Sequence, residues 1–199
     1  MRRIAILTVL GMCSAVFGVL MSSPVQAADE YVGQGQCKVC HNKAAEGEQW
    51  NKWKAEKHAK AFETLKSPEA EKIAKDKGLA KPASESPECL KCHVTGYDAA
   101  AAAPPAKIVP ADGVQCETCH GPGSQHMDAG KKKMFKKDES VDPKQFVAKI
   151  DESTCTKCHN SESPTWKEDK YTKKDGTKTG FDFEQAKEKI SHPNPTKKK

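Results

Sequence analysis

The sequence predicts a mainly α-helical fold of short helices and loops, with little or no β-sheet. No segment shows the strict alternation of apolar and polar residues that is typical of half-buried strands. Signals that begin and end helices recur along the chain instead. Apolar residues make up only 36% of the sequence, whereas ordinary globular domains contain about 45–50% on a similar set that includes glycine. We therefore expect the side chains alone to form too small a core.

Two helices are expected in the first half of the chain. The first spans residues 46–65 and carries His58 on its apolar face. The second begins after Ser67, because Ser67-Pro68-Glu69 combines an N-cap residue, a first-turn proline and an acidic first turn. Gly78 is expected to end this second helix.

Loops dominate the middle of the chain, and one more helix is expected near its end. Residues 99–106 are rich in alanine and proline, which predicts a loop, and Gly121-Pro122-Gly123 is expected to break the chain. The last helix is predicted for residues 182–190. Asp182 and Gln185 have the spacing of a capping box at its start.

Four copies of the motif Cys-x-x-Cys-His carry the strongest chemical signal. This motif is the attachment signature of c-type haem, in which two thiols bond to the haem vinyl groups and the His becomes the first axial ligand of iron. The predicted attachment thiols are Cys37, Cys40, Cys89, Cys92, Cys116, Cys119, Cys155 and Cys158. The predicted first axial ligands are His41, His93, His120 and His159. We therefore expect four covalently bound haem c groups, each with its iron.

Four haems would also supply the missing core, because each is a large apolar plate held at two covalent sites. The predicted architecture is thus a multihaem cytochrome c, with short helices and loops wrapped around the haems. Two four-cysteine zinc sites are the alternative interpretation of the same cysteines. The zinc interpretation leaves the His after every cysteine pair unexplained, so we favour haem.

The second axial ligands must come from outside the motifs. The chain contains seven histidines, which leaves His58, His126 and His192 as candidates after the motif histidines are assigned. Four irons then share three spare histidines, which predicts one haem with an open or water-filled position. Met127 and Met134 are possible axial ligands, but both lie in a segment rich in glycine and lysine that we expect to be exposed.

Residues 1–27 are predicted to be a secretory signal peptide. Arg2 and Arg3 precede an apolar run, and Val25-Gln26-Ala27 fits a small-x-small cleavage site. A retained membrane anchor is the alternative, which the short run and the cleavage site disfavour. Residues 28–199 would then form one tetrahaem cytochrome c domain that is not stably inserted in a membrane. We expect a periplasmic location, with an extracellular one as the alternative.

The formal net charge of +6 does not indicate a nucleic-acid partner. Loss of the leader removes two arginines, and the propionates of four haems would outweigh the positive charge of the ferric centres. The oxidised holoprotein is therefore expected to be near neutrality. The lysine runs Lys131–Lys133 and Lys197–Lys199 are interpreted as solvated surface, with a docking patch for an acidic redox partner as the alternative.

Several stretches together carry a resemblance to a known family. They are Cys37-Lys-Val-Cys-His41 with Trp50, Lys57-His58-Ala59-Lys60-Ala61 with Leu65, Cys89-Leu-Lys-Cys-His93-Val94-Thr95-Gly96-Tyr97, Gly113-Val114-Gln115-Cys116-Glu117-Thr118-Cys119-His120-Gly121-Pro122-Gly123, and Cys155-Thr-Lys-Cys-His159 with His192. The chain resembles the tetrahaem cytochrome c family typified by the nitrifier electron carrier cytochrome c five-five-four. The resemblance covers nearly all of the chain after the leader, and it is hardest to align over residues 161–181.

The resemblance implies a ligand arrangement as well as a helical fold with stacked haem pairs. By resemblance, His126 completes the haem of His41. The resemblance also implies that His58 completes the haem of His120 and that His192 completes the haem of His159. The haem of His93 is left high-spin and five-coordinate, which agrees with the count of three spare histidines.

These observations predict a carrier that passes single electrons between a donor and an acceptor redox protein, as a monomer or weak oligomer. Two alternatives remain open. An open iron at His93 would allow reduction of a small molecule such as nitric oxide, although no acid–base pair obviously accompanies it. A neighbouring subunit could instead supply the missing ligand, as in a polymerising cytochrome filament.

Overall fold

The computed structural model describes residues 28–192. The expected signal peptide, residues 1–27, and the lysine run Lys197–Lys199 lie outside the described residues. Within the described part, β-structure is limited to a hairpin of β1 (Tyr171–Thr172) and β2 (Lys178–Thr179), in which Tyr171 lies opposite Thr179, and to one isolated bridge. The prediction of a mainly helical fold of short helices and loops is therefore confirmed.

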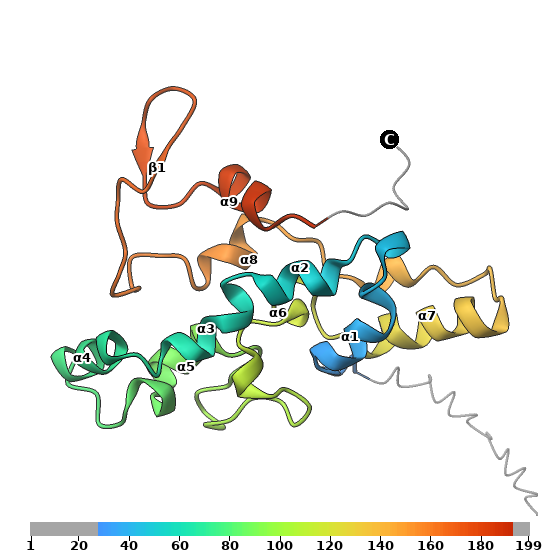
Figure 1. Cartoon of the computed structure of the whole chain (residues 1–199), viewed down its shortest axis with the longest axis horizontal. Helices are drawn as coiled ribbons and strands as arrows, with labels where there is room; N and C mark the ends of the chain where they lie inside the picture. Colours follow the sequence, from blue (N-terminus) through green and yellow to red (C-terminus); the bar gives the residue numbers. More distant parts are fainter. Residues whose placement is uncertain (1–27, 193–199) are drawn as a thin grey trace, which may run out of the picture.

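Residues 28–192 form short α-helices. They are α1 (Gln34–His41), α2 (Gln49–Ala55), α3 (Ala61–Thr64), α4 (Pro68–Asp76), α5 (Pro87–His93), α6 (Cys116–His120), α7 (Ser124–Lys136), α8 (Glu152–Thr156) and α9 (Phe183–Ile190). Single 3₁₀ turns lie between them, namely η1 (Ala44–Glu46), η2 (His58–Lys60), η3 (Ala83–Glu85), η4 (Pro110–Asp112) and η5 (Pro143–Phe146). Figure 1 shows α1 and α7 at one end, α4 and α5 at the other, and α2 and α3 between them.

The expectation of one helix over residues 46–65 is wrong. The chain forms α2, becomes extended at Glu56 (φ −93°, ψ 170°), and then forms η2 and α3. The break follows from contacts with the segment before the third motif. Val114 donates its N–H to the carbonyl of His58 at 2.9 Å, and Trp53 Nε1 donates to the carbonyl of Val114 at 2.8 Å. These long-range bonds outweigh the local preference for a continuous helix.

Both ends of α4 form as the sequence predicts. The Ser67 Oγ accepts the N–H of Ala70 at 3.2 Å, so one orphan donor of the first turn is satisfied. Gly78 follows the helix with φ +66°, and the N–H of Leu79 reaches back to the carbonyl of Ala74 at 2.9 Å. This is the Schellman arrangement, which favours glycine because it needs a left-handed residue.

The last helix is also confirmed, but only half of its capping box forms. Asp182 accepts the N–H of Gln185 at 2.9 Å. The Gln185 side chain does not return to Asp182; its Nε2 donates to the carbonyl of Thr172 at 2.9 Å and ties α9 to the hairpin. The predicted loop at residues 99–106 forms, and Gly121 (φ +79°) ends α6 as expected.

The buried apolar core lies at the end of the molecule that holds α4 and α5. Its buried members are Leu65, Ala74, Ala83, Leu90, Val94 and Ile108. Among the heme-motif residues of the described chain, this cluster includes only Leu90, with the partly buried Cys89 packed against it. The core that the side chains build by themselves is small and one-sided, which agrees with the low apolar content.

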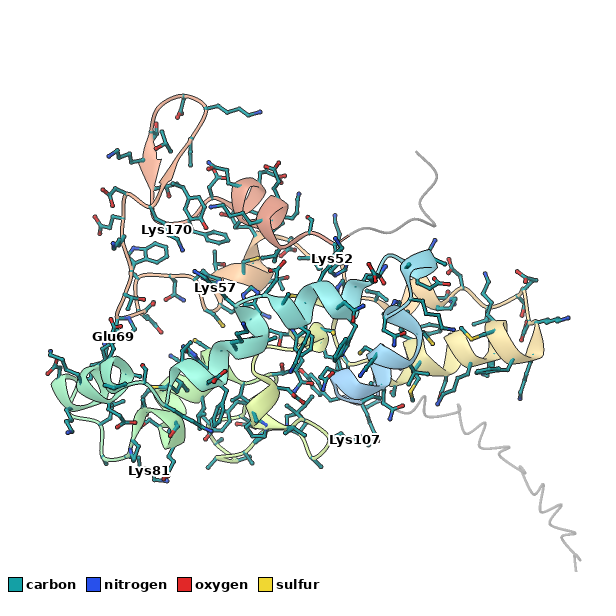
Figure 2. All side chains as sticks on the ribbon, viewed as in Figure 1. Lys52, Lys57, Glu69, Lys81, Lys107 and Lys170 are labelled. Atoms are coloured by element: carbon teal, nitrogen blue, oxygen red, sulfur yellow. The ribbon has the colours of Figure 1, made fainter. Side chains whose placement is uncertain are left out.

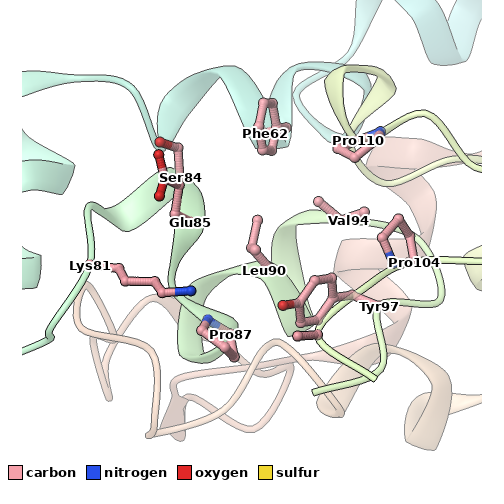
Figure 3. Close-up of a pocket in the computed structure, with 11 residues that line it drawn as sticks. Phe62, Lys81, Ser84, Glu85, Pro87, Leu90, Val94, Tyr97, Pro104 and Pro110 are labelled. Atoms are coloured by element: carbon pink, nitrogen blue, oxygen red, sulfur yellow. The ribbon is translucent and has the colours of Figure 1, made fainter. Parts of the chain in front are cut away.

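A cavity of about 340 Å³ opens beside this core. Figure 3 shows Phe62, Leu90 and Tyr97 among the side chains around it. Its lining contains neither the thiols of the second motif nor His93. The cavity is therefore distinct from the groups that the motif uses for attachment.

Candidate functional site

The eight motif thiols are free and half-buried, and four of them meet in two pairs that join different motifs. The hydrogen bond between the Cys37 and Cys116 thiols raises the pKa of Cys37 and lowers the pKa of Cys116. The contact between Cys92 and Cys158 lowers the pKa of Cys92 to about 7 and raises the pKa of Cys158. The first motif thus lies against the third, and the second lies against the fourth.

A further electrostatic interaction links the two pairs. Burial raises the pKa of Cys119 to about 11, and the charge of the nearby Cys155 thiol contributes to this shift. Cys119 belongs to the third motif and Cys155 to the fourth. The motifs therefore follow one another in space in the order first, third, fourth, second, which differs from their order in the sequence.

The three spare histidines each face a motif histidine. The ring centres of His41 and His126 lie 6.0 Å apart with an interplanar angle of 20°. The ring centres of His58 and His159 are 6.0 Å apart at 70°. In the third pair, His192 faces His120 at 5.9 Å and 41°.

These separations fit a metal held between two imidazoles. Two imidazoles bound on opposite sides of one metal ion by bonds of about 2 Å place their ring centres about 6 Å apart. His120 Nδ1 is buried and has no hydrogen-bond partner within residues 28–192. Each of three motifs thus offers two thiols and two facing histidines. This is the set of groups that a six-coordinate c-type haem needs.

Two of the three pairings implied by the family resemblance are wrong. His126 faces His41 as expected, whereas His58 faces His159 and His192 faces His120. Phe181 stacks on the His159 ring at 5.7 Å and 11°, just before α9 begins. The eight residues of α9 then carry the chain about 12 Å further at 1.5 Å per residue. His192 therefore lies beyond His159 and reaches the third motif.

His93 differs from the other motif histidines. Within residues 28–192, no ring contact joins it to another histidine. Its Nδ1 lies 2.6 Å from the carbonyl oxygen of Ala61 and 3.4 Å from the Oγ1 of Thr64. Because a carbonyl can only accept, Nδ1 carries the proton and Nε2 is left as the ligand nitrogen.

A backbone carbonyl orients one of the spare histidines in the same way. His126 Nδ1 lies 3.0 Å from the carbonyl oxygen of Pro143, in the η5 turn that packs against α7. The proton on Nδ1 leaves Nε2 for a metal. The fold thus holds His93 and His126 each in a defined tautomer.

Burial keeps several of these rings neutral. It lowers the pKa of His120 to about 4 and also lowers the pKa values of His58, His159 and His192. The charges of Lys52 and Lys170, two lysines marked in Figure 2, add to this effect at His192 and His159 respectively. The neutral imidazole is the form that binds a metal, so these rings are ready to act as ligands at neutral pH.

The outer end of α7 is solvated. The lysine run Lys131–Lys133 is exposed, as the sequence predicts. Met134 is 51% exposed, and Phe135 beside it is 75% exposed. The exposure of Met134 gives no support to its role as an axial ligand.

A buried polar network joins the motifs, and sequence reasoning did not assign it a role. Thr95 Oγ1 accepts the N–H of Gln115 at 2.6 Å and lies 2.9 Å from the Oγ1 of Thr118. Gln115 Oε1 accepts the N–H of Gln34, at the start of α1, at 2.8 Å. Glu117 is also buried. The sequence signal for this network was Glu117. It is a charged residue between the two cysteines of a motif, at a place where side chains should face a haem.

The zinc interpretation requires four ligands at one point. Within the part of the chain that the structure describes, no group of three or more Cys, His, Asp or Glu side chains could hold a metal ion. Two pairs of thiols meet, and three pairs of histidines face each other. At three of the four motifs this arrangement offers two axial ligands, as a six-coordinate haem requires.

Comparison with known proteins identifies relatives of this chain. Cytochrome c-554 of Nitrosomonas europaea is 33% identical to this chain over 177 residues, and the match covers 81% of this chain and 72% of the relative. The chain belongs to the cytochrome c-554 family. The family described as cytochrome c554 and c-prime matches residues 36–121, which include the first three motifs. The solved structure of reduced cytochrome c554 from the same organism is 27% identical to this chain in sequence. The alignment covers 83% of this chain and 79% of the chain in that structure, with a TM-score of 0.48.

Membership of the cytochrome c-554 family confirms the resemblance seen in the sequence. It identifies the chain as a c-type cytochrome with covalently bound haem c and as an electron carrier, which acts between redox partners. A search of residues 28–192 found no helix with the length and apolar character needed to cross a membrane.

Proposed function

We propose that this member of the cytochrome c-554 family binds four haem c groups and passes single electrons along them between periplasmic redox proteins. The observation that carries this proposal is the spatial order of the motif thiols. It runs from the first motif through the third and fourth to the second. Since each thiol would be bonded to the edge of a haem, neighbouring haems would lie close to one another. Each haem supplies a reversible one-electron redox centre when bound.

The residues of the chain would hold three centres six-coordinate. His126, His58 and His192 face His41, His159 and His120 respectively, at ring separations of 5.9 to 6.0 Å. A ligand on each face keeps the coordination unchanged between redox states, so little rearrangement accompanies electron transfer. The backbone carbonyls of Ala61 and Pro143 fix the tautomers of His93 and His126.

The test is a combined measurement of haem stoichiometry and spin state on the purified holoprotein. We expect four covalent haems per chain by mass and pyridine haemochrome assay. We also expect EPR signals of three low-spin ferric haems and one high-spin haem. Fewer than four haems, or zinc without Soret absorption, would contradict the proposal.

A second candidate function is supported by the surroundings of His93. This ring has a defined tautomer but no facing histidine within residues 28–192. A haem at this motif would present an open face to a small ligand such as nitric oxide, which could be bound and reduced there. Addition of nitric oxide to the reduced protein should then change the spectrum of one haem in four. An all-low-spin protein that does not respond to the ligand would eliminate this function.

The proposal also includes the location and the oligomeric state of the protein. The predicted leader, residues 1–27, would deliver the chain to the periplasm, where c-type haem is attached. We expect the mature protein to be a monomer or weak oligomer. Sedimentation at several concentrations checks this expectation, and a large assembly with a low-spin second haem would favour the filament alternative.

A further inference from the structure

Glu117 is a buried carboxylate without a basic partner. It is 3% exposed and lies in α6, between the two cysteines of the third motif. Its oxygens accept three backbone N–H groups, from Val32 at 2.8 Å, Gly33 at 2.8 Å and Gly123 at 2.9 Å. Within residues 28–192, the ion pairs involve other carboxylates, and none reaches Glu117.

The three donors to Glu117 are neutral groups. Backbone N–H groups bring partial positive charge to the carboxylate but no compensating cation. A fixed charge in a medium of low dielectric acts over a longer distance than the same charge in water. The field of Glu117 therefore reaches the groups around it.

Those groups are the Tyr31 hydroxyl, whose pKa is raised by burial and by this charge, and thiols of two motifs. The pKa of Cys37 is raised by its hydrogen bond to Cys116 and by burial, and the negative charge of Glu117 raises it further. At Cys116 the same charge opposes the lowering that the hydrogen bond causes. The charge is thus felt at the attachment points of the first and third haems. The pKa shifts of the thiols in the second and fourth motifs arise from burial and from other neighbouring groups.

We propose that Glu117 sets the reduction potentials of the first and third haems by placing a buried negative charge between their attachment sites. This inference rests on the proposed tetrahaem function. A negative charge stabilises ferric iron, which carries one more positive charge than ferrous iron, so it lowers the potential of a nearby haem. Glu117 would act on the two haems through its charge. Its hydrogen bonds to Val32 and Gly33 position the N-terminal segment.

The chain offers a matched neutral control for the structural part of this role. Gln115 is 2% exposed and accepts the N–H of Gln34 at 2.8 Å, so it anchors the same segment without a charge. Loss of either anchor should lower stability. Only loss of the Glu117 charge should move the two potentials.

The experiment is an EPR-monitored redox titration of holoprotein variants. The signals are assigned beforehand with His126→Ala for the first haem and His192→Ala for the third. Glu117→Gln should raise the potentials of the first and third haems and leave those of the second and fourth unchanged. Glu117→Asp keeps the negative charge and should therefore keep the low potentials of the wild type. Gln115→Met should destabilise the protein without changing the potentials of the first and third haems.

A second pair of variants keeps the test decisive if Glu117→Gln does not fold. Val32 is half-buried and donates its N–H to Glu117, so Val32→Lys should bring an ammonium group beside the carboxylate. It should raise the same two potentials, whereas the neutral Val32→Met should not. Unchanged potentials in either charge variant that folds, or an equal shift at all four haems, would overturn the inference. Four haems with the expected spin states in the wild type would leave the proposed function standing in that case.

Discussion

The rings of His58 and His159 face each other at 6.0 Å with an interplanar angle of 70°. His58 lies at the break between α2 and α3, and His159 follows α8, about a hundred residues later in the chain. A metal between them would tie the N-terminal helices to the segment that carries the hairpin and α9. With a metal bound, the pair would be a structural crosslink as well as a ligand set.

Substitution of His58 tests this pairing. His58→Ala should convert the haem of His159 from low-spin to high-spin, because the facing ligand is removed. The haem of His120 should keep its low-spin signal, since His192 faces it. EPR of the two single variants, His58→Ala and His192→Ala, distinguishes the haems. A high-spin signal at the His120 haem in His58→Ala would instead support the pairing implied by the family resemblance.

The ligand set was predictable from the sequence, but its pairing was not. The spare histidines were identified by counting, because four motifs and seven histidines leave only three candidates. Which centre each one reaches depends on the extended residue Glu56 and on Phe181 beside His159. Both are consequences of packing between segments distant in the sequence, which local patterns do not encode.

Gly113 supports the position of His58. Its φ is +66°, and a Cβ at this residue would lie 2.6 Å from the carbonyl oxygen of His58 and 3.1 Å from the N of Ala61. Gly113→Ala should therefore displace the η2 turn, with a loss of more than about 2 kcal/mol in the free energy of unfolding. It should also weaken the low-spin signal of the His159 haem. Denaturant unfolding and EPR measure the two effects.

Gly176 provides the control for this substitution. It also has a left-handed backbone, with φ +85°, but nothing lies within 4 Å of the position of its Cβ. Gly176→Ala should cost only the backbone strain, about 1 kcal/mol, and leave the haem spectra unchanged. Equal losses in the two variants would show that the contact with His58 is unimportant.

The N-cap of α4 gives a prediction about stability alone. Ser67→Ala removes the acceptor for the N–H of Ala70 and should lower the free energy of unfolding by about 1 kcal/mol. Ser67→Asp keeps an acceptor at the helix start and should retain most of the stability. Since α4 packs beside the small apolar core and carries no ligand, neither variant should alter the haem spectra. A spectral change in Ser67→Ala would contradict this separation.

Cap signals of this kind explain which helices the sequence predicts well. Ser67 and Asp182 act on donors three residues away, so a short stretch of sequence contains the whole interaction. The buried network of Thr95, Gln115 and Glu117 is different, because its partners come from the N-terminal segment and the loop before α6. Polar residues next to a motif could have indicated burial, but not the groups that they bind.

Acidification should destabilise the protein through imidazoles whose pKa values are lowered by the fold. Burial lowers the pKa of His120 to about 4 and also lowers the pKa of His192, whereas an unfolded chain has histidines with the ordinary value of about 6.5. Below pH 6.5 the unfolded state therefore binds protons that the folded state does not, and the stability due to these rings is lost as the pH falls toward 4. Denaturant midpoints between pH 7 and pH 4.5 should fall more steeply in the wild type than in His192→Met, which lacks one of the rings. The difference between the two proteins removes the contribution of the carboxylates, and an identical pH dependence would show that the ring of His192 does not contribute.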